Sequence, residues 1–145
     1  MPLEENKAII RRWLDALNNK DLAMLDDIAA TDYFDRTRQL RGLENIKQLI
    51  NITLRAFPDY HENLEDIIGE GDKVWTLETV TGTHTGEYLG LAPTANKFTM
   101  TAVNMWRIVD GKVVEKAGFL DQLDLFKQLG IIEYTEKAKK LFPTK

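Results

Sequence analysis

The sequence predicts an α+β domain in which helices pack on one face of a curved antiparallel sheet. Two periodicities predict this class. Apolar residues recur every three or four positions up to residue 57, as in amphipathic helices, and they alternate from residue 60 onward, as in strands. A chain of 145 residues fits one domain, spanning residues 1–145, with enough buried surface for a core and a cavity.

Three helices are expected in the first part of the chain. Residues 4–18 place one apolar stripe on a helix: Ile9, Ile10, Trp13, Leu14 and Leu17. Asp21 can cap a second, short helix that carries Leu22, Leu25 and Ile28. After an irregular strand or loop at "YFDRTRQLRG", a third helix begins at Gly42 and ends near Phe57, because Pro58 disfavours helical geometry in the residue before it.

Two β-hairpins are expected after the helices. The first is "YHENLEDIIGEGDKVWTLETVTGTHTG", with a turn at Gly-Glu-Gly-Asp, and the second is "KFTMTAVNMWRIVDGKVVEKAGFLD", with the two-residue turn Asp110-Gly111. The segment "EYLGLAPTANK" between them is too long for a tight turn. We expect it to fold over a cavity or against a partner subunit.

Charge and hydropathy exclude several partners. The net charge of −4 argues against a nucleic-acid partner, because phosphate binding needs a basic field. No apolar run reaches the length of a membrane span, and "MPLEENKAII" lacks the order of a signal peptide, so no membrane partner is expected. These features predict a cytoplasmic protein.

Several residue types needed for common catalytic sites are missing from the sequence. The chain has no cysteine and no serine, and its two histidines, His61 and His84, lie far apart. Thiolate chemistry, serine-triad hydrolysis and a metal centre are therefore not expected, and without a phosphate-binding glycine motif no cofactor is expected either. Carboxylates, imidazoles, tyrosines and amides remain for chemistry around apolar walls.

The last predicted strand ends on an acid, Asp121. Strict alternation places Val113, Ala117, Phe119 and Asp121 on one face, and the neighbouring strand has an apolar face with a single polar member, Asn104. An apolar face with one amide and one carboxylate is typical of a ligand cavity, in which Asp121 would act as a base. Two alternatives remain open: Asp121 caps the helix that follows, and Asn104 bonds a neighbouring loop.

The stretch from Phe57 to Gly130 carries a family resemblance. Its most specific pieces are Phe57-Pro58-Asp59, Gly71-Asp72-Lys73-Val74, the run 82–87, Asp110-Gly111-Lys112, and Asp121 before a Leu-rich tail. The chain resembles, over nearly its whole length, the SnoaL-like polyketide cyclases and ester-cyclase-type proteins of the nuclear-transport-factor-2-like superfamily. The resemblance implies a conical barrel, with a strongly bent sheet wrapped round three helices and a deep pocket at the wide end.

The resemblance also implies a chemistry and a set of site residues. An aspartate at the position of Asp121 would act as general base in a cofactor-independent aldol ring closure on a hydrophobic carbonyl substrate, with Asn104 and His84 as donors to the enolate. Aromatic and small residues are expected to form the ligand-binding walls: Tyr33, Phe34, Trp75, Trp106, Ala117 and Phe119.

Three positions depart from the family pattern. Glu115-Lys116-Ala117 replaces a usual His-Trp, Asp35-Arg36 replaces Asp-His, and Glu78 replaces a tryptophan, so that Ala117 is expected to enlarge the cavity. These changes leave three readings open: a cyclase, isomerase or lyase; a non-catalytic protein that binds a hydrophobic small molecule; and an interaction module. We also expect a homodimer that buries the outer sheet face, at Thr99, Thr101, Val103, Met105 and Arg107.

Overall fold

The structure is a computed structural model that describes residues 2–142. The elements follow the predicted order, with a set of helices before the main strands and two short helices at the end. They are α1 (Pro2–Asn18), η1 (Leu22–Met24), α2 (Leu25–Ile28), β1 (Ala29–Asp35), β2 (Leu40–Arg41), α3 (Leu43–Ala56), β3 (His61–Glu70), β4 (Lys73–Thr83), β5 (Lys97–Val109), β6 (Lys112–Leu120), α4 (Gln122–Gln128) and α5 (Glu136–Leu141).

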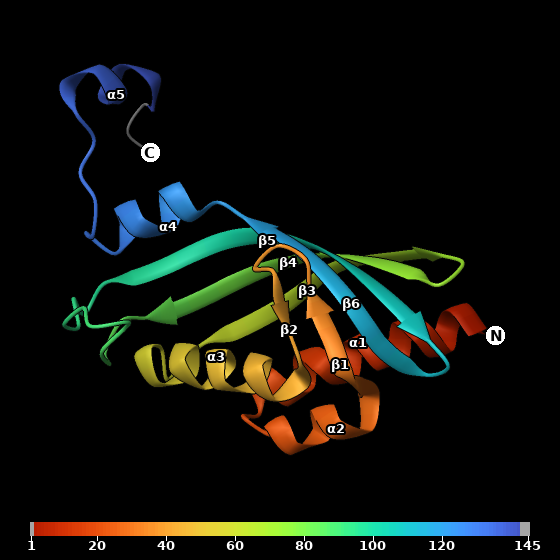
Figure 1. Ribbon diagram of the computed structural model, residues 1–145. Helices are drawn as coiled ribbons and strands as arrows, with labels where there is room; N and C mark the ends of the chain where they lie inside the picture. Colours follow the sequence, from red (N-terminus) through yellow and green to blue (C-terminus); the bar gives the residue numbers. More distant parts are fainter. Residues whose placement is uncertain (1, 143–145) are drawn as a thin grey trace.

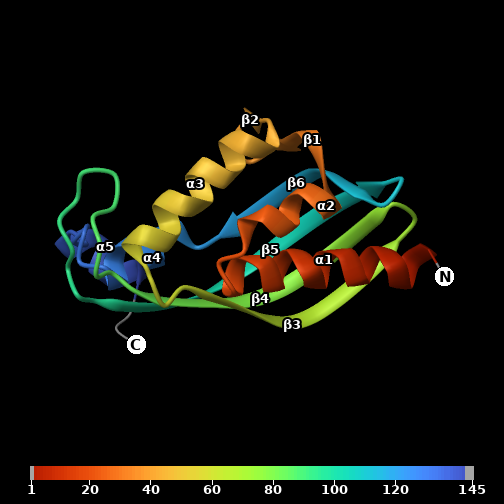
Figure 2. The ribbon, with the colours of Figure 1, turned by 90° about the horizontal axis from the view of Figure 1, so that it is seen from below.

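The strands form one six-stranded sheet in the order β2-β1-β6-β5-β4-β3. Figure 1 shows this sheet as a curved, open layer with α1, α2 and α3 beneath it, and Figure 2 shows the three helices covering its hollow side. The α+β prediction is confirmed. One pairing differs from the expected antiparallel sheet: β1 runs parallel to β6, because the irregular segment after α2 joins the sheet as a strand beside β6.

Both predicted hairpins are present. Asp110 and Gly111 have φ angles of 50° and 76°, which is the left-handed backbone that a tight turn between β5 and β6 requires. None of the helices between residues 2 and 142 has the length and apolar character needed to cross a membrane.

Strand β6 contains a β-bulge that decides which side chains face the helices. Arg107 pairs with Glu115 but Ile108 pairs with Val113, so Val114 is an extra residue without a partner on β5. The side chains that point inward after Val113 are therefore Lys116, Gly118 and Leu120, which lie opposite the buried Trp106, Asn104 and Ala102.

Strict alternation was therefore the wrong prediction for this strand. Beyond the bulge, Ala117 and Phe119 point to the outer face, and Phe119 is 67% exposed. The predicted pocket wall at Ala117 is corrected to an outer-surface position, whereas Phe119, although largely exposed, also borders a hollow that includes Gly118 and Leu120.

The core consists of two hydrophobic clusters. One joins α1, α2 and the start of α3 to Trp106 and Val113, and the other joins Phe57 at the end of α3 to Phe98, Met100 and Leu129. Each helix face is apolar at the spacing that the sequence predicts, and burial of these faces holds the helices against the sheet. The gap between the two clusters is the site of the main cavity.

Candidate active site

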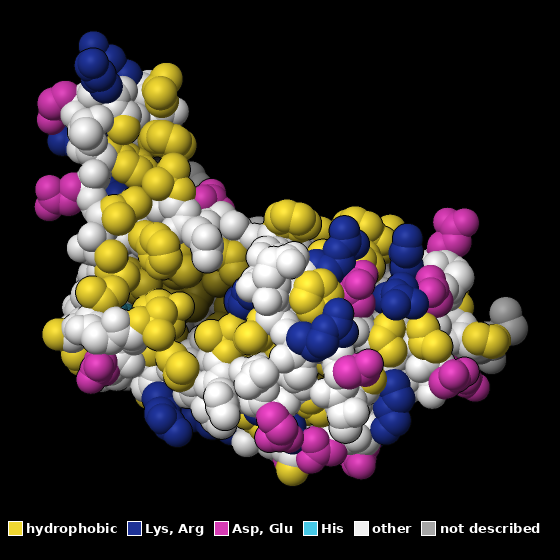
Figure 3. Space-filling view, viewed as in Figure 1, with side chains coloured by type: hydrophobic (Ala, Val, Ile, Leu, Met, Phe, Trp, Pro, Cys, Tyr) yellow, Lys and Arg dark blue, Asp and Glu magenta, His cyan; other side chains and the backbone are white. Residues whose placement is uncertain are grey.

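The main cavity lies between α3 and the inner face of the sheet, with α4 covering one side. Figure 3 shows its mouth as a hollow lined by hydrophobic side chains between α3 and α4. The walls take apolar residues from both core clusters, including Leu17, Tyr33, Ile50, Phe57, Phe98, Met100, Leu120, Leu125 and Leu129. Such a container suits a hydrophobic small molecule.

A second hollow adjoins the first along the inner face of β6. The two share Arg38, Tyr60, Glu62, Met100, Lys116, Leu120 and Gln122, and the second extends to Asn104 and Gly118. Its volume is about 300 Å³, compared with about 130 Å³ for the first. The second hollow alone reaches the lower end of the range for ligand pockets, roughly 300–1,000 Å³.

Two carboxyl groups line the cavity, and they have different partners. Asp35 is buried and bound to Arg38 twice, through the Arg38 backbone N–H at 3.0 Å and through its guanidinium at 2.9 Å. Glu62 accepts a hydrogen bond of 2.5 Å from the hydroxyl of Tyr60 and forms none of the ion pairs found between residues 2 and 142. Glu62 is thus the cavity carboxylate that is free to react.

The environment of Glu62 strengthens its affinity for a proton. Loss of solvent in the cavity and the nearby negative charge of Glu78 raise the pKa of Glu62 from 4.5 to about 7, against the lowering effects of Lys116 and the Tyr60 hydrogen bond. A carboxylate with a pKa near 7 is well matched to general-base catalysis at neutral pH. Burial also raises the pKa of Tyr60 well above its usual value, so the phenol stays a donor.

Glu78 lies behind the cavity wall, where a polar cluster holds it. Its Oε2 accepts from Thr76 Oγ1 at 2.6 Å and from Asn104 Nδ2 at 2.7 Å, while Trp106 Nε1 donates to Thr76 Oγ1 at 3.0 Å. Glu78 is fully buried, and its other oxygen, Oε1, accepts no hydrogen bond from the described residues. The cluster therefore fixes one oxygen of Glu78 and leaves the other available.

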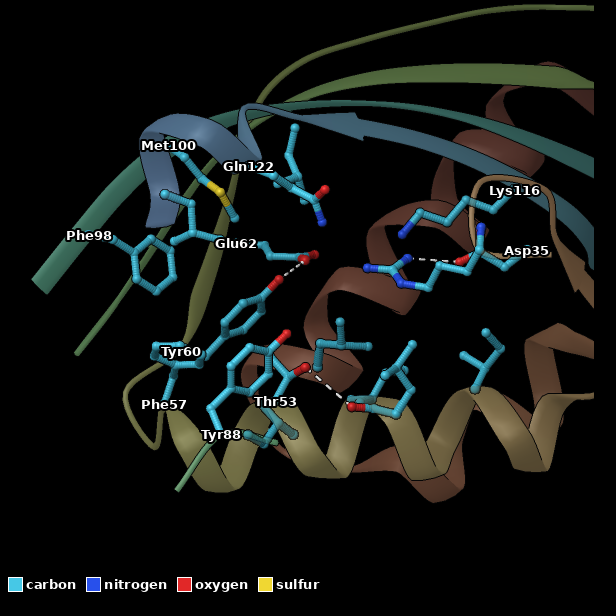
Figure 4. Close-up of a pocket in the computed structure, with 18 of the residues that line it drawn as sticks. Asp35, Thr53, Phe57, Tyr60, Glu62, Tyr88, Phe98, Met100, Lys116 and Gln122 are labelled. Atoms are coloured by element: carbon cyan, nitrogen blue, oxygen red, sulfur yellow. Dashed lines mark hydrogen bonds and ion pairs between the residues drawn. The ribbon is translucent and has the colours of Figure 1, made fainter. Parts of the chain in front are cut away.

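A cation faces Glu62 across the cavity. Figure 4 shows the side chains of Glu62, Gln122 and Lys116 pointing toward one another. The Lys116 ammonium lies 4.8 Å from the centre of the Trp106 ring and takes part in none of the ion pairs in the described part of the chain. It is placed to attract negative charge on a bound molecule.

A side-chain clamp holds the second cation, Arg38, at the rim. Thr37 Oγ1 donates to the carbonyl of Gly118 at 2.9 Å and accepts from its N–H at 2.8 Å, which fixes the loop between β1 and β2 against β6.

A Cβ on Gly118 would collide with Asn104 Oδ1. The glycine therefore keeps the Asn104 amide in position beside Glu78.

Asp121 lies outside both parts of this cavity. It is the N-cap residue of α4, where its Oδ1 accepts from the Asp124 N–H at 3.0 Å, and its side chain borders a separate outer hollow with Leu123, Tyr134 and other residues. The structure therefore agrees with the alternative in which Asp121 caps the helix that follows it.

One predicted donor is committed to another partner, and the other lies outside the cavity with its Nε2 unpaired among the described residues. Asn104 lines the second hollow, but its amide donates to Glu78. His84 is fully buried outside the cavity walls, packs on Phe57 and accepts at Nδ1 from the Thr94 N–H at 3.3 Å. His84 therefore anchors the loop that precedes β5.

The predicted aromatic wall residues divide between the cavity, the core and the surface. Tyr33 lines the cavity, and Trp106 is buried in the core against Trp13. Phe34 stacks under the Arg41 guanidinium away from the cavity walls, and Trp75 is 44% exposed on the outer face of the sheet. The prediction of a cavity position is therefore corrected for Phe34, Trp75 and Trp106.

Sequence reasoning missed Tyr60, Glu62 and Lys116. A signal for Glu78 was present, since alternation along β4 places it on the same face as Val74 and Val80, both of which are buried. Glu62 shares a face with Leu64 on the neighbouring strand. Two acids on apolar strand faces were the available indication of this site.

Comparison with known proteins places the fold and the site in a family. The sequence model of the SnoaL-like polyketide cyclases matches residues 7–129. The chain belongs to the SnoaL-like polyketide cyclase family. This match covers every residue of the cavity described above.

Characterised relatives of this SnoaL-like chain are cyclases of one kind. It is 26% identical over 129 residues to aklanonic acid methyl ester cyclase DnrD of Streptomyces peucetius, covering 84% of this chain and 88% of the relative. It is 25% identical over 134 residues to aklanonic acid methyl ester cyclase AcmA of Streptomyces galilaeus, covering 88% and 92%.

Solved structures agree with the family assignment. AclR of Streptomyces galilaeus, a candidate hydroxylase, superposes with a TM-score of 0.82 at 28% identity, covering 96% of this SnoaL-like chain and 90% of its own. IdmH of Streptomyces antibioticus, a candidate polyketide cyclase, superposes with a TM-score of 0.74 at 30% identity, covering 86% and 98%. The fold is thus shared by relatives assigned to more than one reaction, and the site must decide the chemistry.

Proposed function

We propose that this protein closes a ring in a polyketide-type carbonyl substrate by intramolecular aldol chemistry, with Glu62 as the base and without a cofactor. The observation that carries the proposal is the Glu62 carboxyl group. It ends in an apolar cavity, accepts a hydrogen bond from Tyr60 and has no ion-pair partner among residues 2–142.

The first step is removal of an acidic proton. The Glu62 carboxylate takes the proton from a carbon that lies between two carbonyl groups, and the electron pair of the broken C–H bond moves onto a carbonyl oxygen. The raised pKa of Glu62 favours this transfer, because a desolvated carboxylate binds a proton more tightly than one in water.

The second step is formation of the carbon–carbon bond. The enolate carbon attacks a second carbonyl carbon of the same molecule, and the alkoxide that results takes the proton back from Glu62. Each atom of the substrate is kept, so the reaction is an isomerisation that consumes no co-reactant.

Lys116 supplies the electrostatic part of the mechanism. Its ammonium faces the same space as Glu62 (Figure 4). Enolate and alkoxide oxygens of a substrate bound in this space would carry negative charge beside it. A fixed cation in a cavity with little water stabilises such charge more strongly than it would in solution. The apolar walls hold the folded chain of the substrate in a shape that brings both reacting carbons together.

The resemblance assigns the base to Asp121 instead, and that residue remains the competing candidate. Its position as an α4 cap on an outer hollow favours Glu62, since a base must reach the proton that it removes. The curated relatives act on aklanonic acid methyl ester according to their names, and an ester of this class is a suitable first substrate.

The test follows both exchange and ring closure with purified protein and aklanonic acid methyl ester. Exchange of the acidic C–H for deuterium in D₂O, read by NMR, reports the base alone, and product formation reports the whole reaction. Glu62→Gln should lower both rates by about 10²–10⁴-fold, whereas Asp121→Asn should leave both unchanged.

Two results would contradict the assignment. Loss of exchange in Asp121→Asn, with normal exchange in Glu62→Gln, would return the base to Asp121. Tight binding of the ester by wild-type protein with no exchange and no product would favour the alternative, a small-molecule-binding protein of the same fold.

A further inference from the structure

We infer that Glu62 and Glu78 act as a carboxyl pair that holds one proton between them, and that Glu78 is the positioning residue for Glu62. The catalytic meaning of this inference rests on the proposed function, whereas the pair itself is a property of the protein without substrate.

The geometry of the sheet brings the two acids together. On the paired strands β3 and β4, Glu62 lies opposite Val80 and Glu78 lies opposite Leu64, so the two glutamates are diagonal neighbours on the inner face. Diagonal neighbours are within reach of long side chains, and the charge of Glu78 is one of the causes that raise the pKa of Glu62. Two neighbouring carboxyl groups in a buried site are most stable when only one of them is ionised.

The hydrogen bonds of Glu78 leave one oxygen for that proton. Thr76 and Asn104 both donate to Oε2, which stabilises negative charge on that side of the group. Oε1 is fully buried and accepts no hydrogen bond from the described residues. A buried acceptor without a donor is costly, and a proton carried by Glu62 satisfies it.

Other charged and titratable groups act on the pair from several elements. Lys116 on β6 favours the charged form of Glu62, and Tyr60 stabilises the same form by its hydrogen bond. Arg38 and Asp35 line the same cavity as a bound pair, so their charges largely offset one another. Tyr33 and Tyr88 also line this cavity, and burial raises the pKa of the Tyr33 hydroxyl well above its usual value.

The pair has a consequence for the pH range of the reaction. When the protein loses the shared proton, Glu62 becomes a carboxylate beside a second negative charge, and this repulsion keeps its proton affinity high. Without Glu78, burial would still raise the pKa of Glu62, but Glu62 would ionise at a lower pH and be a weaker base. Glu78 thus sets the strength of the base without touching the substrate.

The experiment is an NMR titration of protein labelled with ¹³C in the glutamate carboxyl groups, with the Glu62 signal assigned by its loss in Glu62→Gln. In the wild type, Glu62 should titrate near pH 7. In Glu78→Gln it should titrate lower by about one pH unit or more, because the neighbouring charge is gone and the new amide donates to Glu62.

Two controls accompany this titration. Glu65→Gln removes an exposed acid from the outer face of the same strand and should leave the Glu62 midpoint in place. If Glu78→Gln does not fold, infrared spectroscopy of the wild type at about pH 6 gives an independent reading. A protonated-carboxyl band that disappears in Glu62→Gln supports the pair, and absence of that band in the wild type overturns it.

The outcomes separate this inference from the proposed function. An unchanged Glu62 midpoint in Glu78→Gln would overturn the pair even if Glu62→Gln abolishes turnover. The expected shift without any turnover would support the pair and contradict the proposed function. If both the carboxyl pair and the proposed function are correct, the rising limb of the pH–rate profile moves to lower pH in Glu78→Gln, together with the NMR midpoint of Glu62.

Discussion

Replacing Glu62 with Gln should change how the stability of this protein depends on pH. Burial and the charge of Glu78 raise the pKa of Glu62 to about 7 in the folded protein, whereas the unfolded chain keeps the ordinary value of 4.5. The folded state therefore binds the Glu62 proton more tightly than the unfolded state does. This contribution is fully present below pH 4.5 and is lost as the pH rises through about 7.

The size of the effect follows from the two pKa values. A difference between 4.5 and about 7 corresponds to about 3 kcal/mol as an upper limit, since each pH unit is worth about 1.4 kcal/mol. Wild-type protein should lose up to this amount of unfolding free energy between pH 4.5 and pH 7. Glu62→Gln should lack that loss, because the amide does not ionise and its N–H group can donate to Glu78 Oε1.

Urea unfolding at a series of pH values measures this difference. Trp13 and Trp106 are buried, so their fluorescence reports the transition, and an unchanged slope in urea shows that the two proteins unfold from comparable states. Glu65→Gln is the matched control and should follow the wild-type curve. If Glu62→Gln also follows the wild-type curve across this pH range, Glu62 is not the raised group and the electrostatic basis of the proposed site is wrong.

Three further perturbations test other parts of the structure. Lys116→Met should lower turnover by about 10²-fold with little change in thermal stability, as expected for loss of one group that stabilises transition-state charge, and steady-state kinetics checks it. Ala117→Trp should leave ligand affinity unchanged, because residue 117 points outward; weaker binding in a fluorescence titration would contradict the bulged register. An exposed apolar patch on the outer sheet face, formed by Leu77, Val103 and Phe119 on three neighbouring strands, is expected to form a dimer interface. Light scattering should therefore give about twice 16.6 kDa for the wild type and 16.6 kDa for Phe119→Asp. A wild-type mass of 16.6 kDa would rule out the dimer.

The helices and hairpins were predictable because their signals are local. The apolar stripe of α1, the proline after α3 and the Asp110-Gly111 turn each act over a few residues, and the structure contains the corresponding elements. The parallel pairing of β1 with β6 was not predictable in this way. It depends on contacts between a short irregular segment and a strand that lies about 80 residues later in the chain.

The site was less predictable because its composition depends on register. One extra residue at Val114 moved Ala117 and Phe119 from the inner face to the outer face, and no residue type in that stretch marks a bulge. Glu62 stands in a strand rich in acids, where alternation alone does not tell a solvated acid from a buried one. Its pKa is set by contacts with Tyr60, which directly precedes the same strand, and with Glu78 and Lys116, which lie on other strands.

Because Val114 is unpaired, loss of this one residue would change which side chains of β6 face the cavity, although no residue that lines the cavity is mutated. In a chain without this insertion, regular alternation would turn Ala117 and Phe119 inward and Lys116 outward, replacing a cation by apolar groups. A deletion of one codon would thus convert a cavity suited to developing negative charge into a neutral one. Relatives whose sequences align well in this strand can therefore differ in the ligands that they bind. The position of the bulge should be compared before the residues of the inner wall are compared.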